Sequence, residues 1–206
     1  MITIYLSHYG DCPVKEKYRT EHQLGLSLLS GILENRFGLS FSDTALPEQI
    51  ENNIYGKPYL KAYPFIHFNI SHCDGLVACA AATAPVGIDI EKIHPFKDSI
   101  LRKVLTPPEK TFLEAFRNTP DKYMEIFFRF WTLKESRIKH SGLGLSMPLT
   151  DFSFTLDLSR EPARITCSQK GLYFTQRRIE NDYFLSICSG EENEEIQIQQ
   201  FDKETL

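Results

Sequence analysis

The sequence predicts an α+β fold made of two halves, and three observations support this prediction. An alternating strand pattern opens the chain and leads into an amphipathic helical pattern near residues 20–37. Three strand patterns follow between residues 65 and 91. A second helical stretch then precedes four more strand patterns, so both sides of residue 94 carry helix and sheet signals. We expect halves 1–94 and 95–206, with a ligand site in the cleft between them.

The composition is that of a globular protein. A chain of 206 residues with 42% hydrophobic content can bury a sizeable core. Its net charge of −4 argues against a general nucleic-acid binder. The sequence shows neither a secretory leader nor an apolar run of about 18 residues, so we expect no membrane partner. Five cysteines without a CxxC pair indicate reduced thiols and predict a cytoplasmic location.

The first half begins with a strand and a helix. Ile2, Ile4 and Leu6 alternate with polar or aromatic residues, which predicts a strand followed by a turn. We expect a basic loop next, carrying Lys15, Lys17 and Arg19. Apolar residues at helical spacing then predict the helix near residues 20–37, which Gly38 ends. Residues 52–64 read as a loop that delivers Lys57 in the string YGKP, and a solvated lysine remains an equal alternative.

Three strands are predicted to follow closely. Residues 65–70 and 76–82 form two of them, joined by the turn SHCDG, and residues 86–91 form the third. Side chains alternate along a strand, so Asp89 and Glu91 share one face about 7 Å apart. One divalent cation would bridge two carboxylates at that spacing. The alternative is a half-buried strand with an acidic, solvated face.

The second half is predicted to begin with helices. Thr106, Pro107 and Glu109 form the pattern of a capping box, and Thr119-Pro120 marks a second helix start. The second helix is expected to run to about His140, before Gly142 and Gly144. Four strand patterns then occupy residues 151–158, 163–167, 172–179 and 183–189. The acidic string EENEE after Gly190 is interpreted as a solvated edge or a frayed end.

The string WTLKESRIK, residues 131–139, adds a second chemical cluster. Residues four apart on a helix share a face, so Glu135 and Lys139 lie on the side of Trp131. A Glu–Lys pair at this spacing is common on helix surfaces and is worth only about 0.2–0.5 kcal/mol, so a structural role stays open. Together with Asp89 and Glu91, however, Glu135 completes three carboxylates that suit a hard divalent cation.

These motifs carry a family resemblance. FNISH at residues 68–72, GIDIE at residues 87–91, and WTLKESRIK followed by GLGLS and MPL resemble the 4′-phosphopantetheinyl transferases. The nearer match is the larger, monomeric surfactin-type class, and the resemblance spans residues 55–149. It implies a monomer with two similar α/β halves related by a pseudo-two-fold axis and an active site in the cleft between them.

The resemblance also implies a reaction and its partners. Coenzyme A would give its 4′-phosphopantetheine arm to a serine of an apo acyl or peptidyl carrier protein, with 3′,5′-adenosine bisphosphate leaving and Mg²⁺ required. Two alternatives belong to other classes of protein. A magnesium-dependent nucleotide or diphosphate hydrolase would activate water with the same carboxylates, and a non-catalytic module would only bind coenzyme A or the carrier protein.

Carried over to this sequence, the resemblance implies a role for seven residues. Asp89, Glu91 and Glu135 would hold Mg²⁺ against the coenzyme A diphosphate. Glu135, or a water on the metal, would take the proton from the attacking serine. Lys139 would stabilise or protonate the departing phosphate. Contacts to the coenzyme are implied for Lys57, Ser71, His72 and Lys139.

The sequence departs from the family pattern at three places. The stretch KEKYRTEHQLG aligns poorly with the family's basic region for the 3′-phosphate, so Lys15, Lys17 or Arg19 would have to take that part. Leu143 stands in SGLGLS where family members commonly carry a basic residue, which would remove one phosphate or carrier contact. Cys73 follows Ser71-His72 where serine is frequent, a change of similar size that we expect to be tolerated.

Overall fold

Two β-sheets form the centre of the protein, in a computed structural model that describes residues 1–160, 162–192 and 194–201. The first sheet has the order β11-β1-β5-β4 and the second the order β6-β10-β9. Neighbouring strands are antiparallel except for the parallel pair β1 and β11. The strands are β1 (Ile2–His8), β4 (His67–Cys73), β5 (Leu76–Ala82), β6 (Val86–Lys92), β9 (Tyr173–Ile179), β10 (Tyr183–Ser189) and β11 (Ile196–Gln200).

Helices and two small hairpins complete the fold, and the predicted α+β class is confirmed. The hairpins pair β2 (Ile50–Asn52) with β3 (Pro58–Leu60) and β7 (Phe154–Asp157) with β8 (Arg164–Cys167). The helices are α1 (Val14–Phe37), α2 (Ala45–Gln49), α3 (Leu101–Val104), α4 (Pro107–Glu114) and α5 (Pro120–Ser141), with single 3-10 turns at Asp98–Ile100 and Gly144–Ser146. Among the described residues, no helix is both long enough and apolar enough to span a bilayer.

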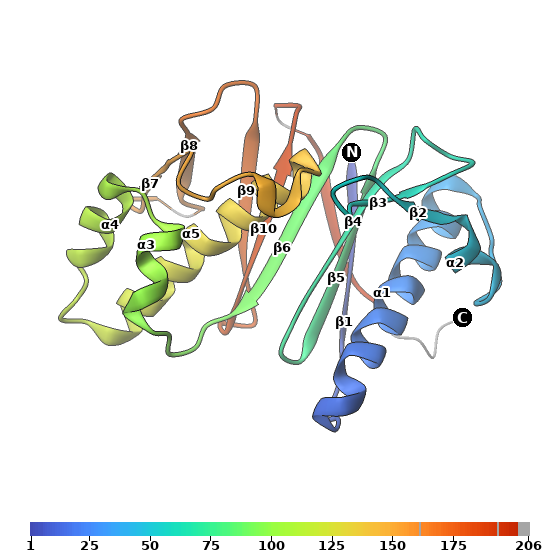
Figure 1. The fold of residues 1–206 in the computed structure, drawn as a ribbon, viewed down its shortest axis with the longest axis horizontal. Coiled ribbons are helices and arrows are strands. Elements are labelled where there is room, and N and C mark those ends of the chain that lie inside the picture. Colours follow the sequence, from blue (N-terminus) through green and yellow to red (C-terminus); the bar gives the residue numbers. More distant parts are fainter. Residues whose placement is uncertain (161, 193, 202–206) are drawn as a thin grey trace.

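Both sheets contain one strand that precedes a long helix and one hairpin that follows it, and β11 has no counterpart in the second sheet. The order strand, helix, hairpin gives β1, α1 and β4–β5 in the first sheet and β6, α5 and β9–β10 in the second. Figure 1 shows α1 running beside the first sheet and α5 crossing the second, with β4 and β6 near the middle of the molecule. The division expected at residue 94 is crossed twice, because β6 pairs with β10 and β11 pairs with β1.

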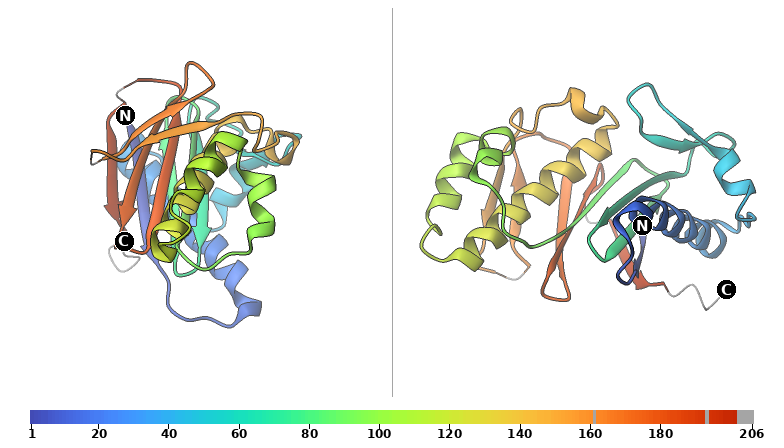
Figure 2. Two further views of the ribbon diagram at one scale, coloured as in Figure 1. Left: turned by 90° about the vertical axis from the view of Figure 1, so that its left-hand side faces the viewer. Right: turned by 60° about the horizontal axis from the view of Figure 1, so that its bottom comes forward.

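The two sheets face each other across an apolar layer. Ile4 of β1, Ile88 of β6 and Ile187 of β10 all belong to this shared core. The opposite face of the first sheet packs on α1, and the second sheet packs on α5, so the helices lie outside the paired sheets (Figure 2). Strand β5 is buried on both faces, which explains why its sequence LVACAAA is continuously apolar.

Helix α5 approaches β6 closely at one glycine. A Cβ atom on Gly87 would lie 2.1 Å from the carbonyl oxygen of Ser136 and 2.3 Å from the backbone nitrogen of His140. Real Cβ atoms do not approach backbone atoms so closely, so only glycine allows this contact. The close approach brings α5 next to the acidic end of β6.

Four details of the predicted elements need correction. Helix α1 begins at Val14, so Lys15, Lys17 and Arg19 lie in its first turns and not in a loop. Apolar spacing missed these turns because they are polar and exposed on most sides. Ser71 and His72 belong to strand β4, since the tight turn contains only Asp74 and Gly75. Helices α2 and α3 and the hairpin β2–β3 were not predicted.

The fourth correction concerns the C-terminal segment. The stretch after Gly190 leads into β11, whose residues Ile196 and Ile198 pair beside Ile2 and Ile4 of β1. A strand therefore follows the acidic string that we interpreted as an edge or a frayed end, and Asn193 of that string lies outside the described residues. The capping box of Thr106 and Glu109 is confirmed.

Candidate active site

One cavity collects most of the residues that the motifs single out. It measures about 340 Å³ and is lined by residues from β4, β6 and α5. These residues are Ile70, Ser71, His72, Asp89, Glu91, Trp131, Glu135 and Lys139. We call this cavity the carboxylate cavity. The predicted face of α5 is confirmed here, because Trp131, Glu135 and Lys139, spaced four apart, all line it.

Asp89 is the most buried acid of the cavity, with 3% of its surface exposed. Its Oδ1 accepts hydrogen bonds from Lys139 Nζ at 2.6 Å and from Ser71 Oγ at 3.0 Å. Its Oδ2 is buried and has no hydrogen-bond partner among the described residues. Burial raises the pKa of Asp89, although the Lys139 ammonium opposes the shift. An unpartnered buried carboxylate oxygen is a group that a cation would satisfy.

Glu91 and Glu135 complete the set of acids. Burial, followed by repulsion from Asp89, raises the pKa of Glu91 to about 7. The indole Nε1 of Trp131 donates to Glu91 Oε1 at 3.1 Å and so fixes one of its oxygens. Burial, and then Asp89, also raises the pKa of Glu135. Three acids whose charged forms disfavour one another make a cavity that favours the binding of positive charge.

Side chains of β4 hold β6 in place, although these two strands do not share a backbone ladder. Asn69 Oδ1 accepts the N–H of Ile88 at 2.8 Å, and Ser71 Oγ accepts the N–H of Ile90 at 3.1 Å. Because Ser71 also donates to Asp89, it fixes both the strand and its carboxylate. The sequence placed Asn69 in a motif without giving it a role. Asn69 and Ser71 are two residues apart on one strand, so they share a face, and this spacing could have predicted that both contact β6.

Lys139 acts as the counter-ion of the cavity. Its Nζ donates to Ser71 Oγ at 2.8 Å as well as to Asp89. Among the described residues, no three His, Cys, Asp or Glu side chains already converge as a ready-made metal site. Electrostatics explains this spacing, because three carboxylates without an ion repel one another and the ammonium draws Asp89 to itself. Carboxylates that line one cavity, one of them with an oxygen free of hydrogen bonds from the described residues, are the donor type that a divalent cation prefers, and the Lys139 ammonium would compete with the cation for Asp89.

Lys57 lies outside the carboxylate cavity, in the connection between β2 and β3. Its Nζ donates to the carbonyl oxygens of Val86 at 3.2 Å and His140 at 3.1 Å. Burial lowers the pKa of Lys57 to about 8. It lines two neighbouring pockets of about 350 and 180 Å³, and the smaller of these also includes Lys139. The structure thus places Lys57 beside the cavity and ties it to the backbone.

Lys134 and Leu143 belong to the motif region but do not line the carboxylate cavity, and no role was predicted for Lys134 from the sequence. Lys134, inside the WTLKESRIK string, is fully buried. Its Nζ contacts Glu109 Oε2 at 2.9 Å and donates to the carbonyl oxygens of Leu149 and Phe152. This lysine anchors α5. Its position inside the motif was the sequence signal that could have pointed to a role for it. Leu143 is partly exposed beyond the end of α5.

The basic residues of α1 lie near the end of β4. Lys17 Nζ forms an ion pair with Asp74 at 2.9 Å, in the turn that follows His72. His72 Nδ1 lies 3.2 Å from Glu21 Oε2 of the same helix. The first turns of α1 are therefore brought beside the His72 edge of the carboxylate cavity, while Lys15 and Arg19 are exposed.

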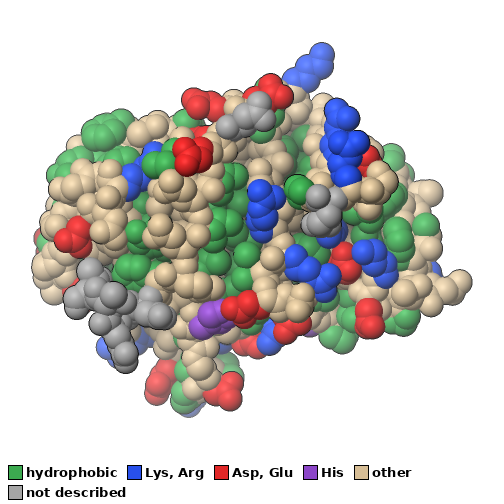
Figure 3. All heavy atoms as spheres, turned by 180° about the vertical axis from the view of Figure 1, so that it is seen from behind, with side chains coloured by type: hydrophobic (Ala, Val, Ile, Leu, Met, Phe, Trp, Pro, Cys, Tyr) green, Lys and Arg blue, Asp and Glu red, His purple; other side chains and the backbone are tan. Residues whose placement is uncertain are grey.

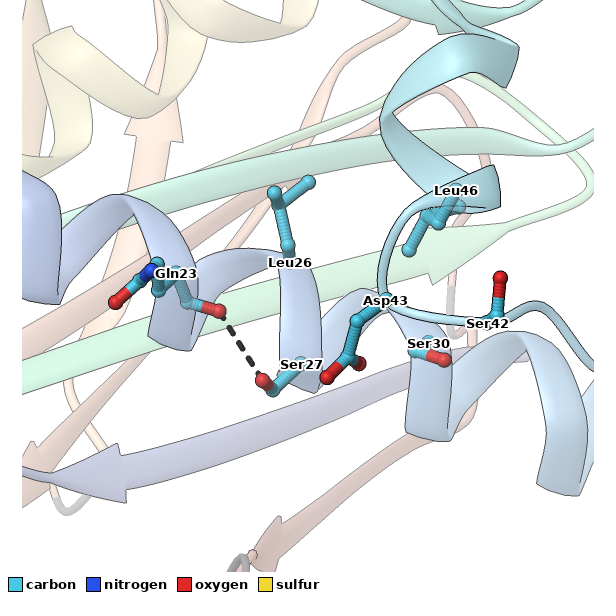
Figure 4. Close-up of a pocket in the computed structure, with 7 residues that line it drawn as sticks. All are labelled: Gln23, Leu26, Ser27, Ser30, Ser42, Asp43 and Leu46. Carbon is cyan, nitrogen blue, oxygen red and sulfur yellow. Dashed lines mark hydrogen bonds between the residues drawn. The ribbon is translucent and has the colours of Figure 1, made fainter.

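A separate pocket of about 170 Å³ lies between α1 and the segment that leads into α2 (Figure 4). It is lined by Gln23, Leu26, Ser27, Ser30, Ser42, Asp43 and Leu46. Asp43 is its one ionisable side chain, and the pocket shares no residue with the carboxylate cavity. A single acid among serines lacks the combination of acids and base that chemistry requires, so the carboxylate cavity is the candidate active site.

Comparisons with known proteins agree with this assignment. The profile of the 4′-phosphopantetheinyl transferase superfamily matches residues 85–188, which include β6, α5 and β10. A 4′-phosphopantetheinyl transferase of Bacillus subtilis is 37% identical over 66% of this chain and 60% of its own length. The transferase Sfp of Bacillus subtilis strain 168 is 32% identical over 81% of this chain and 72% of its own.

A further relative carries the same enzyme name. The transferase HetI of a Nostoc strain is 32% identical over 72% of this chain and 63% of its own length. The matched stretch of the profile covers half of the chain and contains both the acidic strand and the motif helix. The family predicted from the three motifs is therefore confirmed, and the chain belongs to the 4′-phosphopantetheinyl transferase superfamily.

Proposed function

We propose that this protein transfers the 4′-phosphopantetheine group of coenzyme A to a serine of an apo acyl or peptidyl carrier protein, in a magnesium-dependent reaction. One observation carries the proposal. Asp89 and Glu91 of β6 and Glu135 and Lys139 of α5 line a single cavity in a chain that belongs to this transferase superfamily. Three acids and one lysine are the groups that a diphosphate substrate with a divalent cation requires.

The architecture supports a site between two related halves. The repeated order of strand, helix and hairpin is what a duplicated unit with a pseudo-two-fold axis would show. The carboxylate cavity is lined by residues of β4 in the first sheet, of β6 in the second sheet, and of α5, which packs on the second sheet. We propose that the two halves form one monomeric enzyme with its substrate in the cleft between them. A cytoplasmic location is part of this proposal, and five free cysteines fit a reducing compartment.

Asp89, Glu91 and Glu135 are the residues that would hold Mg²⁺. Carboxylate oxygens are its preferred protein ligands, and the free Oδ2 of Asp89 is available to it. When bound, Mg²⁺ neutralises charge on the diphosphate and on its leaving group. The chain prepares for this charge with Ser71, which orients Asp89, and with Trp131, which orients Glu91.

The transfer itself requires one proton acceptor and one leaving-group partner. The serine Oγ of the carrier attacks the phosphorus atom next to the pantetheine arm and forms a new O–P bond. The P–O bond to 3′,5′-adenosine bisphosphate breaks, and this nucleotide takes the electron pair. Glu135 accepts the serine proton. Lys139 stabilises the negative charge on the leaving phosphate.

Four residues are proposed to bind the coenzyme. Ser71 and His72 lie at the β4 edge of the cavity, where His72 would meet phosphate oxygens directly and Ser71 would turn its one hydroxyl hydrogen from Asp89 to do so. Lys57 and Lys139 line the adjoining smaller pocket, which extends the cavity along the end of α5. Coenzyme A carries several phosphate charges, so two lysines beside the carboxylates would balance them.

Charge also bears on the carrier protein. The whole chain has a net charge of −4, so an acidic partner would need a local basic surface. On the face seen in Figure 3, lysine and arginine side chains gather over the half that contains the second sheet. Arg164 of β8 and Arg177 and Arg178 of β9 are exposed basic residues of that half.

The test is an intact-mass measurement. Apo acyl and peptidyl carrier proteins are incubated with coenzyme A, Mg²⁺ and this protein, and the carrier should gain the mass of one phosphopantetheine group. A carrier whose acceptor serine is replaced by alanine is the control. Release of nucleotide without a gain of carrier mass would indicate a hydrolase instead. Binding of coenzyme A with neither product would indicate a binding module.

A matched variant ties the activity to the cavity. Glu135→Gln keeps the size of the side chain and removes its charge, so it should fold normally and transfer at less than about 1% of the wild-type rate, since a positioned base contributes about 10²–10⁴-fold. Glu48→Gln, an exposed change in α2, should leave the rate unchanged. Near-normal turnover by Glu135→Gln would remove Glu135 from the proposed mechanism.

A further inference from the structure

Glu21 is an unusual residue for the buried face of a helix. Its side chain is only 6% exposed, although it is a carboxylate on the face of α1 that meets the first sheet. The other buried residues of α1 are apolar or glycine: Gly25, Leu28, Leu29, Gly31, Ile32 and Leu33. A buried carboxylate costs several kcal/mol unless it is hydrogen-bonded, so its partners indicate its role.

The partners of Glu21 come from two other segments of the chain. The phenol of Tyr9 donates to Glu21 Oε1 at 2.5 Å and also lies 3.0 Å from the carbonyl oxygen of Cys73. His72 Nδ1 lies 3.2 Å from Glu21 Oε2. Glu21 therefore connects the segment after β1 with the end of β4, at the residue that lines the carboxylate cavity.

The helix that carries Glu21 is held firmly against β4. Gly25 lies one turn after Glu21, and a Cβ atom there would be 3.0 Å from Ile70 Cγ2. Such a short distance shows that the α1 backbone runs directly against the β4 side chains. Glu21 thus has a fixed position relative to His72, which is two residues beyond Ile70 on the same strand.

We propose that Glu21, supported by Tyr9, is a positioning residue that fixes the ring of His72 so that its Nε2 faces the coenzyme phosphate. The inference rests on the proposed function and adds two residues to it. Neither Glu21 nor Tyr9 lines the carboxylate cavity, so both act through His72. The side chain of His72 is 46% exposed, and without a partner its ring would be free to rotate.

The chemistry of the pair determines which nitrogen is available. An ionised carboxylate only accepts hydrogen bonds, so pairing with Glu21 across this 3.2 Å contact would place the ring hydrogen on Nδ1. The remaining nitrogen, Nε2, is then the one directed away from α1. A second proton on the ring would make Nε2 a donor to a phosphate oxygen, with Nδ1 still facing the Glu21 carboxylate. This is the arrangement by which carboxylates orient histidines beside metal ions and substrates.

Nitrogen-15 NMR of the ¹⁵N-labelled protein tests the pairing without any transfer reaction. In the wild-type protein, the neutral ring of His72 should be the Nδ1–H tautomer. Glu21→Gln should shift it toward the Nε2–H form, and Tyr9→Phe should cause a smaller shift in the same direction. The matched control is Glu16→Gln, an exposed change in the first turn of α1. An Nε2–H tautomer in the wild-type protein would overturn the proposal.

Steady-state kinetics with coenzyme A and with 3′-dephospho-coenzyme A test how the pair affects binding of the coenzyme. Glu21→Gln should raise KM for coenzyme A about tenfold, the loss of roughly one charge-assisted hydrogen bond, while kcat changes much less. The preference for coenzyme A over 3′-dephospho-coenzyme A should fall if His72 meets the 3′-phosphate. A ratio that falls in Glu16→Gln as well would indicate a general effect on α1 and count against the proposal.

The two failures can be told apart. If the wild-type protein transfers phosphopantetheine but Glu21→Gln and Tyr9→Phe match it in both KM and tautomer, the positioning role is wrong and the proposed function stands. If the wild-type protein modifies no carrier, the proposed function fails, whereas the tautomer measurement still reports on the Glu21–His72 pair. Tyr9→Phe removes a single oxygen atom, so it carries the test if Glu21→Gln does not fold.

Discussion

Lys139 Nζ lies 2.6 Å from Asp89 Oδ1, so a lysine of α5 neutralises the most buried acid of the cavity. A divalent cation and this ammonium would compete for the same carboxylate. Lys139→Gln should therefore bind Mg²⁺ at least about fivefold more tightly, because one nearby like charge is worth roughly 1–4 kcal/mol. Calorimetric titration of the free protein with Mg²⁺ measures this. Lys110→Gln, an exposed change on α4, is the control, and equal affinities for both variants would contradict the prediction.

The raised pKa of Glu91 predicts a pH dependence of stability. Its pKa is about 7 in the folded protein against an ordinary 4.5, so folding favours the protonated form. Its favourable contribution is complete below about pH 4.5 and is lost as the pH rises through 7. The shift corresponds to about 3 kcal/mol. Glu91→Gln does not titrate, so relative to wild type it should gain about this amount between pH 4 and pH 8.

Urea unfolding without divalent cations at the two pH values checks the Glu91 prediction. Glu48→Gln, an exposed change in α2, should follow the wild-type pH profile. A difference between Glu91→Gln and wild type that stays constant with pH would show that the carboxyl of Glu91 is not responsible. Mg²⁺ at pH 8 should stabilise the wild-type protein more than the variant, because only the former offers the third carboxylate.

Gly87→Ala tests the contact between α5 and β6. The added methyl group would meet the Ser136 carbonyl oxygen at 2.1 Å, and backbone atoms cannot rotate out of the way. We expect a loss of about 3 kcal/mol or more in the free energy of unfolding, at the upper end for overpacked sites. Gly10→Ala is the matched control, since a Cβ there meets nothing within 4 Å. Equal urea midpoints for the two variants would disprove the close approach.

Lys134→Met tests the buried anchor of α5. Methionine has a similar length but no charge, so Glu109 would be left as a buried carboxylate without its cation. Breaking a buried ion pair in this way costs about 3–5 kcal/mol. Adding Glu109→Gln should recover part of the loss, because the remaining charge is removed. Urea unfolding measures both, with the exposed Lys110→Met as control; a double variant less stable than Lys134→Met would contradict the pairing.

The sequence predicted the chemical groups of the site better than their surroundings. Asp89, Glu91 and Glu135 come from two regular elements, and period-two and period-four spacing is enough to put each set on one face. The cavity that joins them depends on Gly87, whose missing side chain lets α5 approach β6. A glycine inside a strand signals close approach without naming the partner. The contact between α5 and β6 could therefore not be predicted from one sequence.

Buried charges were the hardest feature to predict. Lys134 and Glu21 sit in helical stretches where charged residues usually face water, and only the fold shows that each is enclosed with its own partners. Lys57 was expected among the coenzyme contacts, and the structure places it in a pocket beside the cavity, tied to backbone carbonyl groups. Long-range pairs such as Glu21 with His72 depend on how α1 lies on β4, which local patterns do not encode.

The parallel pairing of Ile2 with Ile196 has a consequence for how the chain folds. During synthesis, the N-terminal half is made before β11, so one edge of its sheet is still unpaired. Strand β6 likewise has no pairing partner until β10 has been made. If the chain were cut at residue 94, neither fragment would contain all the strands of a sheet. Each would therefore expose unpaired strand edges, which promote aggregation. The two halves can therefore share an order of elements although neither half is expected to fold without strands from the other.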